Sequence, residues 1–251
     1  MIYITGDTHA DFKRFNMKRF PEQREMTRDD YIIITGDFGG VWEYRGESKQ
    51  EKYILDWLED HRFTLLFIDG NHENFDRLHE YPVKEWHGGV VHEIRPHLLH
   101  LMRGYVFDID GKKIFAFGGA RSHDIDGGVL SLDDPDLKQK MRWMNRENIL
   151  YRIDHYSWWA DEFANEEEMK RGMENLKANG NKVDYIITHC CPSSTQALFA
   201  GDEYKADDMT DYLDEIKQTV NYEKWFFGHY HDRIDVTDKD ILLYDQIIRI
   251  K

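Results

Sequence analysis

The chain of 251 residues has no long apolar run: nowhere does it contain the roughly 20 consecutive apolar residues that a membrane-spanning helix needs. Its first segment, MIYITGDTHAD, lacks the basic head and the small-residue cleavage site of a secretory signal. Cysteine is scarce as well, with only Cys190 and Cys191. Because neighbouring cysteines close a strained ring, we expect no disulfide between them. The sequence therefore favours a protein of the reducing cytoplasm without a membrane segment.

Positive charge is also in short supply, since 33 Lys and Arg stand against 48 Asp and Glu, for a formal net charge of −15. Long-range attraction to polyanions is therefore weak, and we expect neither a membrane nor long nucleic acid as a partner. A locally positive pocket could still bind a small phosphorylated substrate. No repeat or Pro/Gly/Ser-rich linker divides the chain, so we expect a single domain over residues 1–251.

Short runs of apolar and β-branched residues recur along the chain and have the length of strands buried on both faces. They are Ile2–Thr5, Tyr31–Thr35, Thr64–Ile68, Ile114–Phe117, Tyr185–Thr188 and Trp225–Phe227. Two amphipathic helices are predicted between them, one with the apolar face Tyr53, Ile54, Trp57 and Leu58, the other with Met209, Tyr212, Leu213, Ile216 and Val220. This alternation at both ends of the chain predicts an α/β domain.

The middle and the end of the chain predict antiparallel strands instead. Residues 90–117 form consecutive strand-like segments, with Asp110-Gly111 as a hairpin turn between Tyr105–Ile109 and Lys113–Phe117. Residues 233–250 resemble a second antiparallel set, with a turn at 238–240.

Residues 121–180 contain no convincing strand, and we expect a helical insertion there that caps the site. The best helix in this stretch is Glu166–Lys177, with Met169, Met173 and Leu176 facing inward and Gly180 beyond its end.

Polar clusters of one kind follow five of the predicted strands. They are Gly6-Asp7-Thr8-His9, Gly36-Asp37, Asp69-Gly70-Asn71-His72-Glu73, His189 and Gly228-His229-Tyr230-His231. In open α/β sheets the ligand site lies outside the carboxyl ends of the strands, so these segments should meet in one crevice. A single cluster is typical of an ordinary turn. The same residue types after five strands of one chain, with glycines that let the chain turn sharply, predict a shared metal site.

In chain order the clusters give GD-x-H, GD, GNHE, a late His and GH-x-H, and this pattern resembles the signature of calcineurin-like metallophosphoesterases from residue 6 to 231. The resemblance implies a four-layer α/β (α+β) sandwich of two mixed β-sheets flanked by helices. It also implies two divalent metal ions, the first held by Asp7, His9 and His231, the second by Asn71, His189 and His229, with Asp37 bridging both. By the same resemblance, a metal-bridging hydroxide attacks the phosphorus of a phosphate mono- or diester without forming a phospho-enzyme.

The chemistry of these donors fits such a centre. Imidazole, carboxylate and amide oxygen without thiolate suit ions such as Mn, Fe, Zn, Ni or Co. Two such ions about 3.5–4 Å apart make hydroxide available near neutral pH and neutralise the charge that grows as the ester bond breaks. His72 is left for proton transfer, and by resemblance it protonates the leaving alkoxide or steadies the phosphoryl oxygens. Glu73 could orient the imidazole of His72 or lie at the surface.

Two departures from the pattern argue against a protein Ser/Thr phosphatase. Asp37 is followed by Phe38-Gly39-Gly40 instead of an Asp-Arg pair, and Ala10 stands where those enzymes have Gly. The segments 118–124 and Trp158-Trp159 are similar to segments of small bacterial and phage members of the superfamily. Arg121 in the first of them is a candidate phosphate clamp, because its planar fork matches phosphate oxygens.

Several alternatives stay open. His123 could join the site, and Cys190 or Cys191 could add a soft ligand, although buried inert thiols are the better interpretation. The Trp pair is better explained as core than as a base-stacking platform. At the level of function, the alternatives are a nucleotide or nucleic-acid phosphodiesterase and a non-catalytic, metal-binding interaction scaffold. The sequence indicates neither the physiological substrate nor the oligomeric state.

Overall fold

The computed structural model describes residues 1–201 and 204–251 and contains two large mixed sheets packed face to face. The first sheet has, in spatial order, β15 (Ile247–Arg249), β1 (Ile2–Thr5), β2 (Tyr31–Ile34), β3 (Thr64–Phe67), β6 (Leu98–Leu101), β5 (Gly89–Arg95) and β4 (Val83–Trp86). The second has β13 (Ile234–Asp235), β14 (Asp240–Leu242), β12 (Lys224–Phe227), β11 (Tyr185–Thr188), β8 (Lys112–Phe117) and β7 (Tyr105–Ile109).

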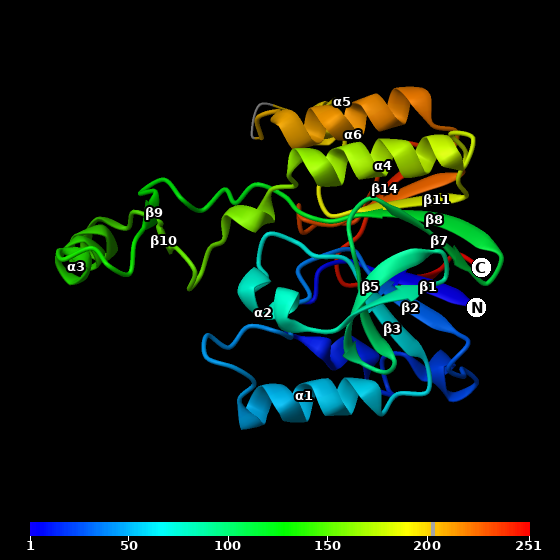
Figure 1. Cartoon of the computed structure of the whole chain (residues 1–251), viewed down its shortest axis with the longest axis horizontal. Coiled ribbons are helices and arrows are strands. Elements are labelled where there is room, and N and C mark those ends of the chain that lie inside the picture. Colours follow the sequence, from blue (N-terminus) through cyan, green and yellow to red (C-terminus); the bar gives the residue numbers. More distant parts are fainter. Residues whose placement is uncertain (202–203) are drawn as a thin grey trace.

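Helices cover the outer faces of both sheets (Figure 1). The second sheet carries α4 (Glu166–Ala178), α5 (Ser193–Phe199) and α6 (Asp208–Thr219), and the first carries α1 (Lys49–Glu59). A short helix, α2 (Phe75–Glu80), follows β3. The predicted four-layer sandwich is confirmed. Within residues 1–201 and 204–251, no helix has the length and apolarity that crossing a membrane requires.

The central strands are those that the sequence predicted, because their side chains meet an apolar layer on either side. β1, β2, β3 and β11 are buried along their whole length. β1, β2, β3 and β6 run parallel to one another, as do β8, β11, β12 and β14. Their carboxyl ends lie away from the two chain termini, at one end of the body (Figure 1).

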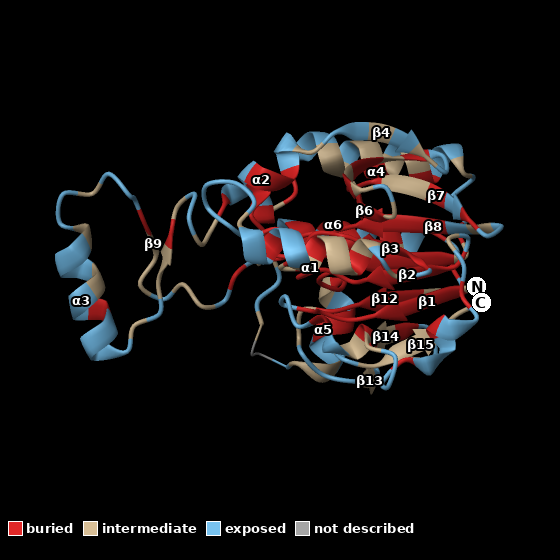
Figure 2. Cartoon of the chain, turned by 90° about the horizontal axis from the view of Figure 1, so that it is seen from below, coloured by how far each residue is buried: buried red, intermediate tan, exposed pale blue. Residues whose placement is uncertain are grey.

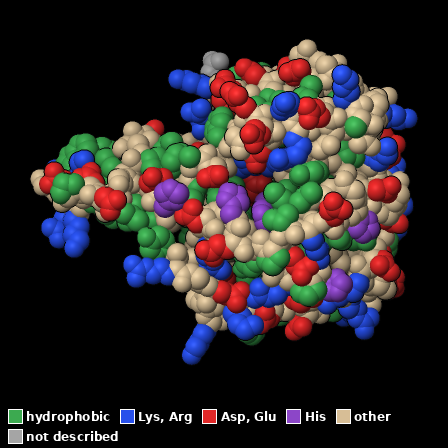
Figure 3. Space-filling view, viewed as in Figure 1, with side chains coloured by type: hydrophobic (Ala, Val, Ile, Leu, Met, Phe, Trp, Pro, Cys, Tyr) green, Lys and Arg blue, Asp and Glu red, His purple; other side chains and the backbone are tan. Residues whose placement is uncertain are grey.

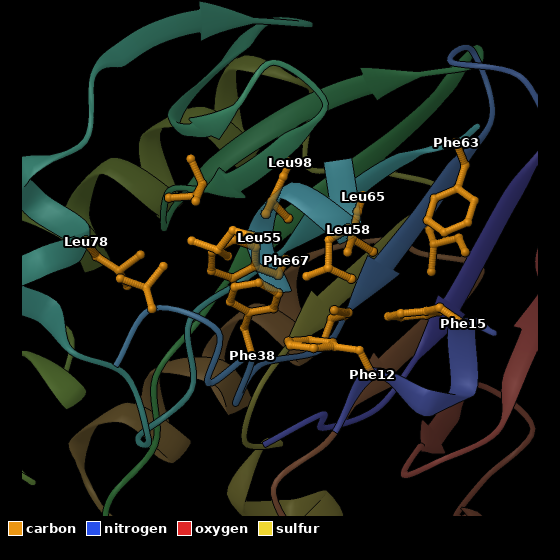
Figure 4. Packing of buried hydrophobic residues seen from close by; sticks show 14 of the residues in the cluster. Phe12, Phe15, Phe38, Leu55, Leu58, Phe63, Leu65, Phe67, Leu78 and Leu98 are labelled. Atoms are coloured by element: carbon orange, nitrogen blue, oxygen red, sulfur yellow. The ribbon is translucent and has the colours of Figure 1, made fainter. Parts of the chain in front are cut away.

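Apolar side chains between α1 and the first sheet form one of three core clusters (Figure 4). In it, the ring of Phe38 stacks on that of Phe67 at 4.1 Å between centroids. α1 contributes Leu55 and Leu58, whereas Tyr53, which we predicted for the same face, is 71% exposed. The apolar stripe of α1 is therefore rotated away from Tyr53. On α6 and at its C-cap Val220, all five predicted apolar positions are buried.

The antiparallel middle of the chain is divided between the two sheets. β4, β5 and β6 extend the first sheet, while β7 and β8 form a hairpin in the second. Asp110 and Gly111 connect the hairpin with positive φ angles of 49° and 71°, as a two-residue turn needs. At the C-terminus, β13 pairs antiparallel with β14, whereas β15 pairs antiparallel with β1 of the other sheet.

Residues 123–158, which we call the arm, project from the body at the carboxyl end of the sheets (Figure 1). The arm contains α3 (Leu137–Glu147) and two short parallel strands, β9 (Val129–Leu130) and β10 (Arg152–Ile153). The expectation that this part of the chain has no strand is therefore wrong, because strands of two residues are too short to show a periodic pattern. Most of the arm is exposed (Figure 2).

The helix predicted at Glu166–Lys177 is confirmed as α4, but it belongs to the body and packs beside the second sheet. It begins with a capping box in which the Asn165 side chain accepts from the N–H of Glu168 while the Glu168 carboxylate accepts from the N–H of Asn165. That the arm caps the site stays a prediction.

Candidate metal centre

The predicted ligand clusters meet at the carboxyl end of the two sheets. Asp7, His9, Asp37 and His231 each offer one ligand atom, and these atoms all lie within 4.8 Å of one another. The Nε2 atom of His9 lies 3.5 Å from Oδ2 of Asp37 and 2.8 Å from Nε2 of His231. Both carboxylates are buried and both imidazoles are partly exposed, so solvent reaches this group of donors. Figure 3 shows histidine side chains gathered where the arm meets the body.

Of the other three predicted ligands, His189 faces the second oxygen of Asp37, and Asn71 and His229 lie beside His189. Nε2 of His189 is 3.4 Å from Asp37 Oδ1 and 3.2 Å from Asn71 Oδ1. The ring of His229 lies beside that of His189, with 5.0 Å between centroids. The structure thus brings all seven predicted ligands together in two groups that share Asp37.

The backbone at the site adopts an unusual conformation. Residues with positive φ between 43° and 70° include His9, Ala10, Asp37, His229 and His231. A residue with a Cβ adopts this left-handed conformation at a cost of roughly 1–2 kcal/mol. Such strain clusters at functional sites, where the surrounding fold holds the chain in place.

Three glycines make room for the ligand side chains. In each case a Cβ would lie about 2 Å from the side chain of a predicted ligand that another cluster supplies. The distances are 2.0 Å from Gly70 to Asp37 Oδ1, 2.0 Å from Gly228 to Asp7 Oδ1 and 2.1 Å from Gly36 to His189 Nδ1. The glycines of the motifs are therefore required by close approach of the neighbouring ligand as well as by sharp turns of the chain.

Hydrogen bonds orient several of the donors. Nδ1 of His189 lies 2.8 Å from the carbonyl oxygen of Thr35, so it donates there and leaves Nε2 free to bind a cation. The N–H of His229 donates to both carboxylate oxygens of Asp7 at 3.1 Å. The guanidinium of Arg14 donates to the carbonyl oxygen of Asp7 and thereby braces the chain just beyond β1.

A buried network that the sequence did not predict fixes the amide of Asn71. Its Nδ2 atom donates to Ser122 Oγ at 3.2 Å, and Ser122 Oγ donates to Glu162 Oε2 at 2.6 Å. With the nitrogen of the amide engaged on this side, the oxygen faces His189. Ser122 and Glu162 lie 51 and 91 positions after Asn71, so no local pattern could have indicated them.

A second buried network precedes the GNHE cluster. Arg103 donates to Oδ2 of Asp69 from Nε at 2.8 Å, and Nε2 of His100 lies 3.0 Å from Oδ1. Burial alone would raise the pKa of Asp69, but Arg103 and His100 lower it below its usual range. The ionised Asp69 therefore anchors the segment that carries Asn71 and its neighbour His72.

The electrostatics of the site favour positive charge. Burial acts to raise the pKa of Asp37, but the histidines around it, His189 first among them, hold it below its usual range. Burial acts to lower the pKa of His189, but Asp37 and Asp7 raise it to about 10. The two carboxylates thus stabilise a positive charge between them, whether it is a proton on His189 or a bound cation.

His72 lies beside the two groups of ligands. Its ring centroid is 5.5 Å from that of His9, and its backbone N–H donates to Asp37 Oδ1 at 2.8 Å. Burial lowers the pKa of His72, the nearby Asp37 raises it, and Arg152 of the arm lowers it further. The net effect is a lowered pKa, so the protonated ring is a stronger acid than free imidazolium.

Glu73 has neither of the two roles that we considered. It is fully buried, and its carboxylate accepts hydrogen bonds from the backbone N–H of Phe38 at 2.6 Å and of Gly39 at 3.2 Å. Burial raises the pKa of Glu73 well above its usual value. Its function is structural, because it holds the turn that follows Asp37.

The remaining predicted residues lie around the site. The Arg121 side chain is 56% exposed, with Nε 3.4 Å from Asp207 Oδ2 and its guanidinium 4.8 Å from the ring centroid of Phe163. Its role as a phosphate clamp stays a prediction. His123 lies close to the ligands, with Nε2 3.0 Å from Nε2 of His229.

The cysteines and Trp159 match the simpler interpretations, whereas Trp158 is half-buried and lies outside the core clusters. Cys190 and Cys191 are free and buried, and burial raises the pKa of both thiols, that of Cys191 to about 12. Thiols in this state are poor metal ligands. Trp159 is 1% exposed and belongs to the core, where its Nε1 donates to Asp76 at 2.8 Å.

A family model described as calcineurin-like phosphoesterase matches residues 1–233. No curated protein matches the chain. The matched range contains all of the ligand clusters and ends just after the last of them.

Proposed function

Because the chain belongs to the calcineurin-like phosphoesterase family, we propose that it hydrolyses a small phosphate mono- or diester at a centre of two divalent metal ions. The proposed ligands of the first ion are Asp7, His9 and His231, those of the second are Asn71, His189 and His229, and Asp37 is shared. The donor set suits Mn, Fe, Zn, Ni or Co. When bound, such ions make hydroxide available near neutral pH and neutralise charge on the phosphoryl oxygens.

The position of Asp37 is the observation that carries this proposal. Its Oδ2 atom faces His9 at 3.5 Å, and its Oδ1 atom faces His189 at 3.4 Å. A carboxylate placed in this way can give one oxygen to each of two ions. The fully buried side chain and the hydrogen bond from the N–H of His72 hold it in this orientation.

We assign proton transfer to His72. It lines a cavity next to His9, so its imidazole can reach the oxygen of a leaving group that occupies this cavity. Protonation of that oxygen lets the alcohol depart as a neutral molecule. The net charge of −15 supports a small substrate over long nucleic acid, and the arm would cover such a substrate from one side.

A direct test measures hydrolysis of p-nitrophenyl phosphate and bis(p-nitrophenyl) phosphate with Mn, Zn, Ni or Co, and again after chelation. We expect turnover that depends on metal, and the ratio between the two substrates separates monoesterase from diesterase. Protein that binds two ions per chain but hydrolyses neither ester, nor an alkyl phosphate, would indicate the scaffold alternative.

The role of His72 has its own test. His72→Ala should keep the metal content but slow turnover of an alkyl phosphate by roughly 10²–10⁴-fold. The loss should be much smaller for the p-nitrophenyl ester, because p-nitrophenolate departs without a proton. An equal loss for both substrates would contradict proton donation and leave electrostatic stabilisation of the phosphoryl group.

A further inference from the structure

A cavity of about 440 Å³ adjoins the metal centre on the side of His9 and His72. Apolar side chains of Trp42 and Ile54 line it, together with Arg152 of the arm. Its volume is typical of sites for small molecules. Its lining combines these apolar side chains with polar ones, which are His9, Glu43, Gln50, Glu51, His72 and Arg152. None of the proposed metal-ligand roles accounts for Trp42, Ile54 or Arg152.

The walls of the cavity are held in place by the body of the protein. The ring of Trp42 packs edge-on against that of Trp159, with 5.8 Å between centroids, and Trp159 is buried in the core. Ile54 lies on α1 and packs against the same core cluster. Gly39 and Gly40 line the cavity without any side chain, so a flat ligand can approach the backbone there.

Of the charged side chains Glu43, Glu51 and Arg152 that line the cavity, two have an ion-pair partner among the described residues and one does not. Glu51 and Arg77 form a buried ion pair, in which Nη2 of Arg77 lies 2.8 Å from Oε1 of Glu51. The charge of Glu51 is therefore neutralised. Arg152 is paired with Asp124, with Nε 3.1 Å from Oδ1. Within the described part of the chain, the carboxylate of Glu43 has neither a hydrogen bond nor an ion pair. Glu43 therefore contributes an unmatched negative charge to the cavity wall.

We propose that this cavity binds the alcohol part of the substrate, and that this part is an uncharged group with a planar apolar ring. The inference rests on the proposed function, because it takes the phosphoryl group to lie at the metal centre. From there the ester oxygen is near His72, and the ring extends between Trp42 and Ile54. A second anionic group on the ring would be repelled by the exposed Glu43, so the proposal predicts weaker binding of substrates whose alcohol part carries a carboxylate or another phosphate.

Binding of phosphonates to the full chain loaded with Mn²⁺ tests this without any turnover. Isothermal titration calorimetry should give a Kd for phenylphosphonate that is roughly tenfold lower than that for methylphosphonate, since only the phenyl group buries apolar surface. 4-Carboxyphenylphosphonate should bind more weakly than phenylphosphonate, and Glu43→Gln should remove that difference.

Two tryptophan variants locate the effect. Trp42→Ala should make the Kd values of phenylphosphonate and methylphosphonate nearly equal, because it removes one wall of the cavity. Trp143→Ala, which removes an exposed tryptophan of α3 that does not line the cavity, should keep the full difference between the two Kd values. An equal reduction in both variants would overturn the assignment to this cavity.

The outcomes for the wild-type protein separate this inference from the proposed function. Binding of methylphosphonate and inorganic phosphate without any gain from the phenyl group overturns the inference and leaves the proposed function intact. No binding of any phosphonate or of phosphate overturns both.

Discussion

The side chains of His123 and His229 meet at their Nε2 atoms, which lie 3.0 Å apart. At this distance one nitrogen donates its proton and the other accepts it. A metal-bound imidazole uses its second nitrogen to donate to a neighbouring acceptor, which fixes both its tautomer and its orientation. If His229 binds the second ion, His123 is the acceptor, and the arm contributes a residue that orients the ligand.

We therefore expect His123→Ala to weaken binding of the second ion by roughly 10–100-fold while the first ion binds as before. Stepwise metal titration followed by calorimetry measures both affinities. His123→Gln keeps an acceptor oxygen and should retain most of the affinity. His87→Ala, at an exposed histidine that does not contact the site, is the control. Equal weakening of both ions by His123→Ala would contradict an effect through His229.

Asp37→Asn should weaken both ions together, because it removes the one negative charge that the two groups of ligands share. Metal analysis of the purified protein should fall from about two ions per chain in the wild type toward none. Asp11→Asn removes an exposed carboxylate from the loop after His9 and should keep the full metal content. A variant at Asp37 that still retains one tightly bound ion would show that Asp37 serves only one of the two positions.

Gly70→Ala should disturb the metal centre through steric contact alone. The added methyl group would lie 2.0 Å from Asp37 Oδ1, so the carboxylate or the chain must move. We expect loss of metal binding and a decrease of roughly 1–3 kcal/mol in the free energy of unfolding. Gly111→Ala is the matched control, because its φ of +71° makes alanine unfavourable while no atom lies within 4 Å of the new Cβ. It should cost about 1–2 kcal/mol and leave metal binding unchanged.

Asp69→Asn tests the buried pair with Arg103 through its pH dependence. At pH 7 the substitution leaves the buried guanidinium without its main partner and should cost roughly 3–5 kcal/mol in the free energy of unfolding. The folded-state pKa of Asp69 is lowered, so its contribution is fully present above about pH 3.9, the unfolded value, and is lost as the pH falls toward the folded-state pKa. The difference between wild type and variant should therefore shrink below about pH 4.

Urea unfolding of metal-free protein between pH 7 and pH 3 measures this difference. Asp29→Asn, at an exposed aspartate, controls for the loss of one carboxylate. A stability difference for Asp69→Asn that stays constant down to pH 3 would mean that Asp69 is not held ionised by its partners.

The parts of the fold that the sequence predicted correctly depend on short segments. Ile2–Thr5 and Tyr185–Thr188 are apolar on both faces and are followed directly by ligands, so strand and site are visible in fewer than ten consecutive residues. The turn at Asp110-Gly111 is local for the same reason, since both residues tolerate positive φ.

What could not be predicted depends on contacts between distant segments. Ser122 reaches Asn71 only because the chain crosses from one sheet to the other, and Arg152 reaches the site only through the course of the arm. The assignment of β7 and β15 to different sheets has no local signal either, because an edge strand has the same pattern in both. The role of Glu73 was not predicted, because it depends on hydrogen bonds that its buried carboxylate accepts from two distant backbone N–H groups.

The left-handed backbone of the site separates stability from activity. At His9, Asp37, His229 and His231, glycine would relieve the strain of positive φ but remove a donor atom. Selection for thermal stability alone would thus enrich glycine there and yield well-folded proteins that no longer bind metal. Ala10, with a φ of 60°, carries the same strain but supplies no donor. It is the one position of this set where glycine should raise the melting temperature and leave metal binding intact.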